Sequence, residues 1–283
     1  MSERLDTLQR RLGEALFARV AGPEGRANRE RFAAPGPRWF AADRPIRQVH
    51  GDAAMFAGGL RALLLQSLHP QAMIAVAQHS DYRSDPWGRL QRTSTFLAAT
   101  TFGPADDAQR AVDQVRRVHQ YITGTGPDGA AYRADDPHLL RWVHVAEADS
   151  FLRMHQRYGA RPLDAAGCDG YVADASRIAE ALGVPDPPRT RSELDAALAA
   201  YRPELRAIPQ AREAARFLVW NPPLPLVARG PYALLAATAV AELPAWARRE
   251  LRLPRPNAAE SVLLPPVGRG VVGAVRWAMG ARR

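Results

Sequence analysis

The sequence contains no lysine: all 38 Lys+Arg residues among its 283 residues are arginine. This absence excludes every site that depends on a lysine amine. Such sites include the P-loop of nucleotide-binding proteins, the ATP site of protein kinases, the Schiff base of pyridoxal enzymes and lysine nucleophiles. Several large enzyme classes are therefore ruled out before any motif is considered.

Cysteine is almost as scarce, with Cys168 alone in the chain. A single thiol excludes an intrachain disulfide, an iron–sulfur cluster held only by cysteines and any CxxC zinc site. We interpret Cys168 as a small structural residue rather than a thiolate ligand.

Long apolar runs and blocks of one charge are also lacking. The net charge is +9, but the arginines are scattered and the aromatic residues do not alternate with them, so we expect no nucleic-acid partner. Residues 1–17 carry charges throughout, unlike a signal peptide. The longest apolar stretch, 231–241, is too short to cross a bilayer. We expect a soluble, cytoplasmic protein.

What the sequence does contain is helical periodicity, because apolar residues recur every three or four positions along most of the chain. No alternating strand pattern stands out. A stretch rich in proline and glycine, 22–45, separates the first helix from the rest. The sequence predicts one all-α domain over residues 1–283, with helices at 4–20, 52–68, 71–79, 88–102, 106–123, 137–158, 170–182, 191–201, 209–219, 231–242, 244–252 and 268–279.

Local signals set some of these boundaries. His69 precedes Pro70, and a residue before proline is disfavoured in the helical region, so the chain should bend there. Asp136 followed by Pro137 is a helix start, with an N-cap and a proline at the first helical position.

A histidine lies on an apolar face of the helix at 106–123. Val112, Val115, His119 and Ile122 recur at spacings of three and four and so share that face. A lone histidine in such a place is either a core residue bonded to a carbonyl or a ligand of a metal or haem. Spacing alone leaves both interpretations open.

The helix at 88–102 carries a second unusual group. Arg89 and Thr93 are four residues apart, on the face that also carries Phe96, and Arg92 is adjacent. A buried guanidinium needs an anionic or polar partner. These arginines either extend to solvent along the surface, or Arg89 meets a carboxylate, a haem propionate or a polarised oxygen.

His144 and Glu147, one turn apart on the helix at 137–158, could pair or bind a metal together. A ferritin-like di-iron centre is excluded because no glutamate is followed three residues later by histidine. The HExxH motif of zinc hydrolases and the GxSxG motif of serine hydrolases are also missing.

Taken together, several strings resemble one family. These are RALLLQSLHPQAMIAVAQHSDYRSDPWGRLQRTSTFLAATTFG, VRRVHQYITGTG, AYRADDPHLLRWVH and ELPAWARREL. The chain resembles, over about residues 45–255, the haem-dependent oxygenase family of latex clearing protein (rubber oxygenase) and the mycophenolic acid biosynthesis oxygenase MpaB.

The resemblance implies a globin-like helical core that holds haem b and uses O2 as co-substrate. It implies His119, in VRRVH, as the iron ligand, with His144 in WVH as the runner-up. The distal arginine and threonine of the family fall on Arg89 and Thr93, with Arg92 beside them as a further catalytic candidate. The family thus suggests an oxygenase that acts on a small apolar substrate.

The chain departs from rubber oxygenase at two points. The lysine before the distal threonine is replaced by Arg92, and the segment 69–78 lacks the distal glutamate that the rubber enzyme uses as a base. We therefore do not expect polyisoprene cleavage. Cleavage of a smaller alkene, hydroxylation and dehydrogenation all remain open.

The alternative is a non-catalytic helical protein that binds a ligand or a membrane surface. Its support is the segment 268–283, where apolar residues alternate with arginines as in a basic interfacial helix. A terminal helix that docks on its own core would show the same composition.

Overall fold

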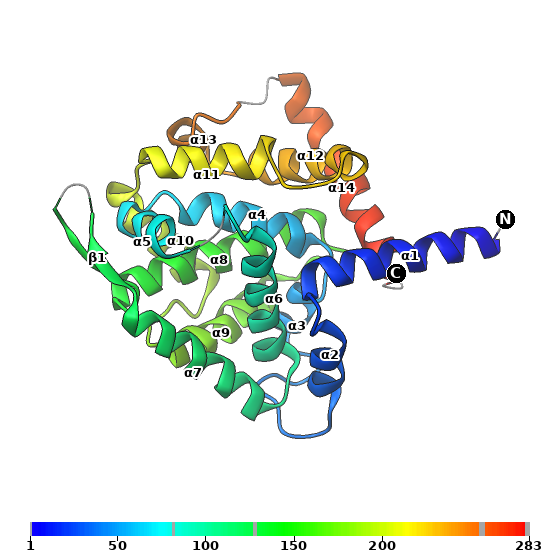
Figure 1. Ribbon diagram of the computed structural model, residues 1–283, viewed down its shortest axis with the longest axis horizontal. Coiled ribbons are helices and arrows are strands. Elements are labelled where there is room, and N and C mark those ends of the chain that lie inside the picture. The colour runs from blue at the N-terminus through cyan, green and yellow to red at the C-terminus, as the bar shows by residue number, and fades with distance from the viewer. Residues whose placement is uncertain (1, 81–82, 127–128, 255–257, 281–283) are drawn as a thin grey trace.

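The computed structural model describes residues 2–80, 83–126, 129–254 and 258–280, and it confirms the all-α prediction (Figure 1). The helices are α1 Ser2–Ala21, α2 Gly25–Ala33, α3 Pro45–His50, α4 Ala54–Gln66, α5 Pro70–His79, α6 Pro86–Phe102, α7 Ala105–Tyr121, α8 Pro137–Tyr158, α9 Ala165–Leu182, α10 Arg191–Tyr201, α11 Pro209–Trp220, α12 Leu226–Ala241, α13 Ala245–Glu250 and α14 Ala258–Ala278, with a 3-10 turn, η1, at Arg202–Glu204. The globin-like arrangement implied by the resemblance stays a prediction.

The expected boundary signals operate as predicted. The carboxylate of Asp136 accepts hydrogen bonds from the backbone N–H groups of His138 and Leu139 and so caps α8. His69 is extended, with φ −84° and ψ 116°, and α5 begins at Pro70 immediately after it. These caps fix where the helices that carry the candidate site begin.

Two expectations were wrong. The stretch 22–45 contains α2, because residues 26–34 include no Gly or Pro and so leave room for a short helix. A small antiparallel sheet also follows α7: β1 Thr123–Thr125 pairs with β2 Ala131–Arg133, with Gly124 opposite Tyr132. Strands of three residues are too short to show an alternating pattern, so no local signal predicts them.

The helices α4 and α8 form the centre of the molecule and lie side by side (Figure 1). Leu64 and Leu65 of α4 pack in one apolar cluster with Trp142 and Ala146 of α8. A Cβ atom at Gly58 would come within 2.8 Å of the Phe151 ring, so the lack of a side chain at Gly58 permits this close approach.

A buried ion pair also joins these two helices. Arg61 of α4 lies 2.8 Å from Asp149 of α8, and both side chains are almost completely buried. Arg61 also donates hydrogen bonds to the Ser150 hydroxyl at 2.6 Å and to the Glu242 carbonyl at 3.0 Å. Partners on every side are what make a buried charge tolerable.

The C-terminal helix α14 docks on this centre. Val272 is fully buried in a cluster that includes Met154 and Tyr158, and Arg276 forms an ion pair of 2.8 Å with Asp52. Trp277 remains exposed on the outer face. Core docking thus accounts for the described part of 268–283, whereas Arg282 and Arg283 lie outside the described residues.

Within the described residues, no helix has the length and apolar character needed to cross a bilayer.

Candidate functional site

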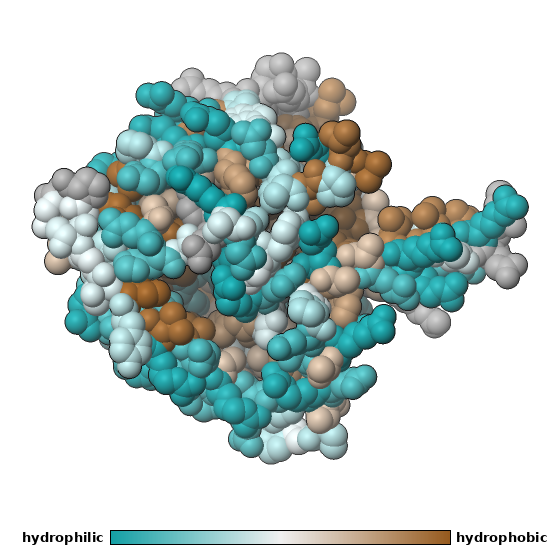
Figure 2. Space-filling model, in the orientation of Figure 1, coloured by the Kyte–Doolittle hydropathy of each residue, from teal (hydrophilic) through white to brown (hydrophobic). Residues whose placement is uncertain are grey.

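The helices α6 and α7 form a V whose apex is the Gly103–Pro104 turn (Figure 1). Arg89 on α6 and His119 on α7 are equally far along the sequence from Pro104. They therefore lie on opposite arms of the V, near its open end. Apolar atoms gather along the edge of α7 that borders this V (Figure 2). The structure therefore brings the two main predicted site residues to the same end of the α6–α7 hairpin.

His119 lies half-buried on α7, in line with the buried Val112. Burial lowers the pKa of His119 below its ordinary value, while the charge of Asp135 partly opposes this shift. The imidazole is therefore neutral at physiological pH, which is the state that binds a metal. Ile122, expected on the same face, lies just past the end of the helix.

The three predicted residues of α6 separate into two groups. Arg89 donates a hydrogen bond of 2.7 Å to the Ser80 hydroxyl, and Thr93 donates one of 3.1 Å to the Arg89 carbonyl. Arg92 points to solvent, with 66% of its side chain exposed, and lies 3.4 Å from Asp85. Arg89 is therefore half-buried, whereas Thr93 and Arg92 are both exposed.

His144 and Glu147 project together from α8. Burial lowers the pKa of His144 to about 4 and raises that of Glu147 to about 7. Both side chains nevertheless keep some accessible surface. Desolvation disfavours the charged form of each group, so both side chains are held in their neutral forms over a wider range of pH than usual.

The Nε2 atom of His144 is buried and has no hydrogen-bond partner among the described residues. Successive residues of a helix turn by about 100°, so His144 faces away from Trp142 and from the packed interface with α4. A buried nitrogen without a partner is costly unless a ligand satisfies it. His144 therefore presents a ring nitrogen that a ligand or metal could satisfy.

His50, at the end of α3, is a residue that sequence reasoning missed. Its Nδ1 lies 2.8 Å from the Thr101 hydroxyl, while its Nε2 is buried without a partner in the described chain. Its ring packs edge-on against Phe151 and Tyr171, and burial lowers its pKa to about 3. No motif surrounds His50, so only the folded chain identifies it.

A groove of about 1330 Å³ leads from the surface to His50. Its walls come from α1, α2, α3, α4, α6 and α14, and aromatic side chains contribute much of the lining, namely Phe17, Phe32, Phe56 and Phe102. Its size and apolar lining suit a small organic molecule.

The donor set fits an iron porphyrin. Neutral imidazoles with buried or half-buried nitrogens are the ligands that haem iron takes most often. His119 and His144 are the residues that could hold the iron, since each is neutral near pH 7 and stands on a long helix.

Comparison with known protein families gives one match. The family described as "ER-bound oxygenase mpaB/B'/Rubber oxygenase, catalytic domain" matches residues 47–277. This range covers the α6–α7 hairpin, α8 and nearly all of α14. Neither the curated proteins nor the solved structures yield a match.

Proposed function

Because the chain belongs to the mpaB/rubber oxygenase catalytic-domain family, we propose that it is a haem b-dependent oxygenase that acts with O2 on a small apolar substrate. The observation that carries the cofactor is the imidazole of His144, whose pKa is lowered to about 4 by burial and whose Nε2 is buried without a partner among the described residues. When bound, the haem supplies O2 activation. The chain supplies the remaining functions.

We assign the iron ligand to His119 and keep His144 as the runner-up. Both imidazoles are neutral near pH 7, because burial lowers each pKa. His119 stands on the arm of the V opposite Arg89, so ligation there leaves the α6 side free for O2. His144 stands on α8 instead.

Arg89 and Thr93 provide hydrogen-bond donors on the α6 side. Such donors, fixed in advance, stabilise negative charge as it develops on a reacting oxygen. Arg92, the third candidate, extends to solvent, so its contribution in this proposal is confined to the rim of the site.

Glu147 can hold or release a proton near neutral pH, since burial raises its pKa to about 7. A group whose pKa matches the working pH is well suited to proton transfer. We propose Glu147 as the proton-handling residue, because the segment 69–78, where the rubber enzyme carries its glutamate, has no acidic residue.

The test is a haem titration followed by absorption spectroscopy on the wild type, His119→Ala and His144→Ala, with His79→Ala as control because His79 is exposed. We expect the wild type and His79→Ala to bind one haem per chain and His119→Ala to lose most of it. Haem loss in His144→Ala alone would transfer the ligand role to His144. A wild type that binds no haem would instead favour the non-catalytic ligand-binding protein.

A further inference from the structure

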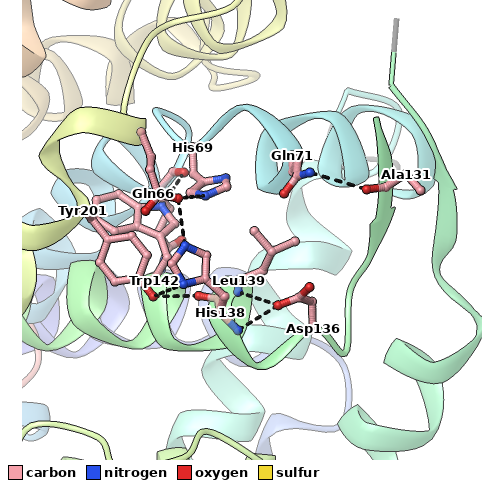
Figure 3. A network of polar contacts seen from close by, with 10 residues as sticks. Gln66, His69, Gln71, Ala131, Asp136, His138, Leu139, Trp142 and Tyr201 are labelled. Carbon is pink, nitrogen blue, oxygen red and sulfur yellow. Dashed lines mark hydrogen bonds and ion pairs between the residues drawn. The ribbon is translucent and has the colours of Figure 1, made fainter. Parts of the chain in front are cut away.

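Three side chains of types that can bind a metal converge at a place separate from the proposed oxygenase site (Figure 3). They are His69 immediately before α5, His138 in the first turn of α8 and Glu204 in η1. One ligand atom from each lies within 4.8 Å of the other two. The Nε2 atom of His138 lies 2.7 Å from Glu204 Oε2, and that of His69 lies 3.5 Å from the same oxygen.

The fold positions these residues through features already seen in the sequence. Pro70 keeps His69 extended at the start of α5, and the Asp136 cap with Pro137 begins α8 one residue before His138. The 3-10 turn after α10 brings Glu204 to them. Each side chain therefore comes from the end of a helix or from a short helical turn rather than from a long loop.

His69 points to a missing ligand. His69 is only 4% exposed, and neither nitrogen of its ring has a hydrogen-bond partner among the described residues. Leaving a buried polar group unpaired destabilises the folded chain. Burial also lowers the pKa of His69, with Glu204 opposing and Arg206 adding to the shift, so the imidazole is neutral and has a lone pair to donate.

Neighbouring side chains orient the other two ligands. The Tyr201 hydroxyl donates to the His138 carbonyl at 2.8 Å and lies 3.4 Å from His138 Nδ1. The rings of Tyr201 and His138 also pack together, with centroids 4.7 Å apart. This contact directs Nε2 of His138 toward Glu204 and resembles the outer support that metal-bound histidines usually have.

We propose that His69, His138 and Glu204 bind a divalent transition metal of the zinc class. Two imidazoles and one carboxylate are a common ligand set for this ion. A tetrahedral ion with bonds of about 2.0–2.1 Å separates its ligand atoms by about 3.3 Å, so only small side-chain shifts are needed. The side chains of His138 and Glu204 are 53% and 44% exposed, which gives the ion a way in and leaves its fourth position to water.

The site is independent of the proposed oxygenase function. His138 lies on the same face of α8 as Trp142, whereas His144 points away from that face. The metal would join α5, α8 and η1 and so stabilise the folded chain. Metal ligands must be deprotonated to bind, so affinity should fall as the pH is lowered.

The test measures Zn²⁺ binding to the purified full-length chain after chelator treatment and dialysis. Zinc content is determined by elemental analysis and affinity by competition with a chromogenic chelator. We expect one Zn²⁺ per chain, and at least about tenfold weaker binding in His138→Gln and Glu204→Gln, because each loses one of three ligands. Both residues are exposed, so these variants avoid the folding risk of replacing His69.

The matched controls are His79→Gln and Glu213→Gln, which alter exposed residues outside the cluster and should bind zinc as the wild type does. Zn²⁺ should also raise the Tm of the wild type and of both controls, but not of the two ligand variants. Absence of stoichiometric zinc binding by the wild type at about 100 μM Zn²⁺ would overturn the proposal, since a site that weak stabilises negligibly at lower concentrations. Equal zinc affinity in the wild type and both ligand variants would overturn it as well.

Discussion

At the scale of single residues, Glu147 shows how enclosure changes chemistry. Its pKa rises to about 7 because burial disfavours the carboxylate. Its neighbour one turn away, His144, shifts in the opposite direction, to about 4, for the same reason. Both groups are therefore neutral over a range of pH in which they would normally be charged.

Glu147 should make stability depend on pH. Between about 4.5 and 7 the folded chain keeps the Glu147 proton that the unfolded chain loses, so stability falls as the pH rises through this range. Glu147→Gln should remove this loss and make the chain more stable than wild type at pH 8, by up to about 3 kcal/mol. Urea unfolding of the wild type and of Glu147→Gln at pH 5 and pH 8 measures this difference in stability. If the exposed control Glu213→Gln changes the pH dependence equally, the enclosed carboxyl is not its source.

Arg89 and Thr93 should affect oxygen chemistry more than folding. Arg89→Leu and Thr93→Val remove a donor but keep much of the side-chain volume, and both residues lie on a face of α6 only partly covered by protein. We expect each variant to keep its haem and to slow turnover by up to about a hundredfold, the equivalent of about 3 kcal/mol. O2 affinity of the reduced protein gives a readout without a known substrate.

The control for these variants is Arg189→Leu, an exposed arginine paired with Glu180 far along the chain. Unchanged O2 affinity in Arg89→Leu and Thr93→Val, together with a Tm lowered by several degrees, would show that both residues are structural.

The sequence predicted part of the site and missed part of it. His119 was visible because it interrupts a regular apolar face, and His144 and Glu147 because of their spacing. His50 was invisible, since its significance depends on Thr101, Phe151 and Tyr171, which come from distant segments. Likewise, the clustering of His69, His138 and Glu204 depends on tertiary contacts that no local pattern encodes.

At the scale of helices, the ion pair between α4 and α8 should be a major determinant of stability. Arg61→Met leaves Asp149 buried without its closest partner, and breaking a buried pair from one side costs about 3–5 kcal/mol. Denaturant unfolding should show this loss. The double variant Arg61→Met/Asp149→Leu should recover much of it, because no buried charge remains alone. A single variant as stable as wild type would contradict this assignment.

The docking of α14 gives a second prediction at this scale. Val272→Asp places a charge in a fully buried position and should lower the free energy of unfolding by at least about 3 kcal/mol. Ala274→Asp on the exposed side of the same helix should change it by less than about 0.5 kcal/mol. Equal, small effects would mean that α14 is detached in solution and would revive the interfacial-helix interpretation.

Helices were predictable to the extent that their signals are local. Proline located the start of α5, the Asp136 cap with Pro137 located the start of α8, and periodicity located α10. The hairpin β1–β2 and helix α2 were missed because each is short and held by its surroundings. The composition of 268–283 is equally consistent with a membrane-surface helix and with a helix docked on the core. Only the buried contacts of Val272 and Arg276 distinguish these two interpretations.

At the scale of the whole molecule, the match to the family extends along most of the chain rather than resting on one motif. Its match runs over residues 47–277, and the helices that it covers form both the α4–α8 centre and the α6–α7 hairpin at the proposed haem site (Figure 1). Short strings in a fixed order were therefore enough to identify the family. They do not specify the substrate.

The measurement that tests the central claim most directly is the haem content of the full-length protein purified from haem-replete cells. We predict a Soret band and one iron-porphyrin per chain, with both lost in His119→Ala while the helix content stays near wild type. A colourless protein that stays colourless after haem is added would contradict the account, whatever oxidation the protein were found to catalyse.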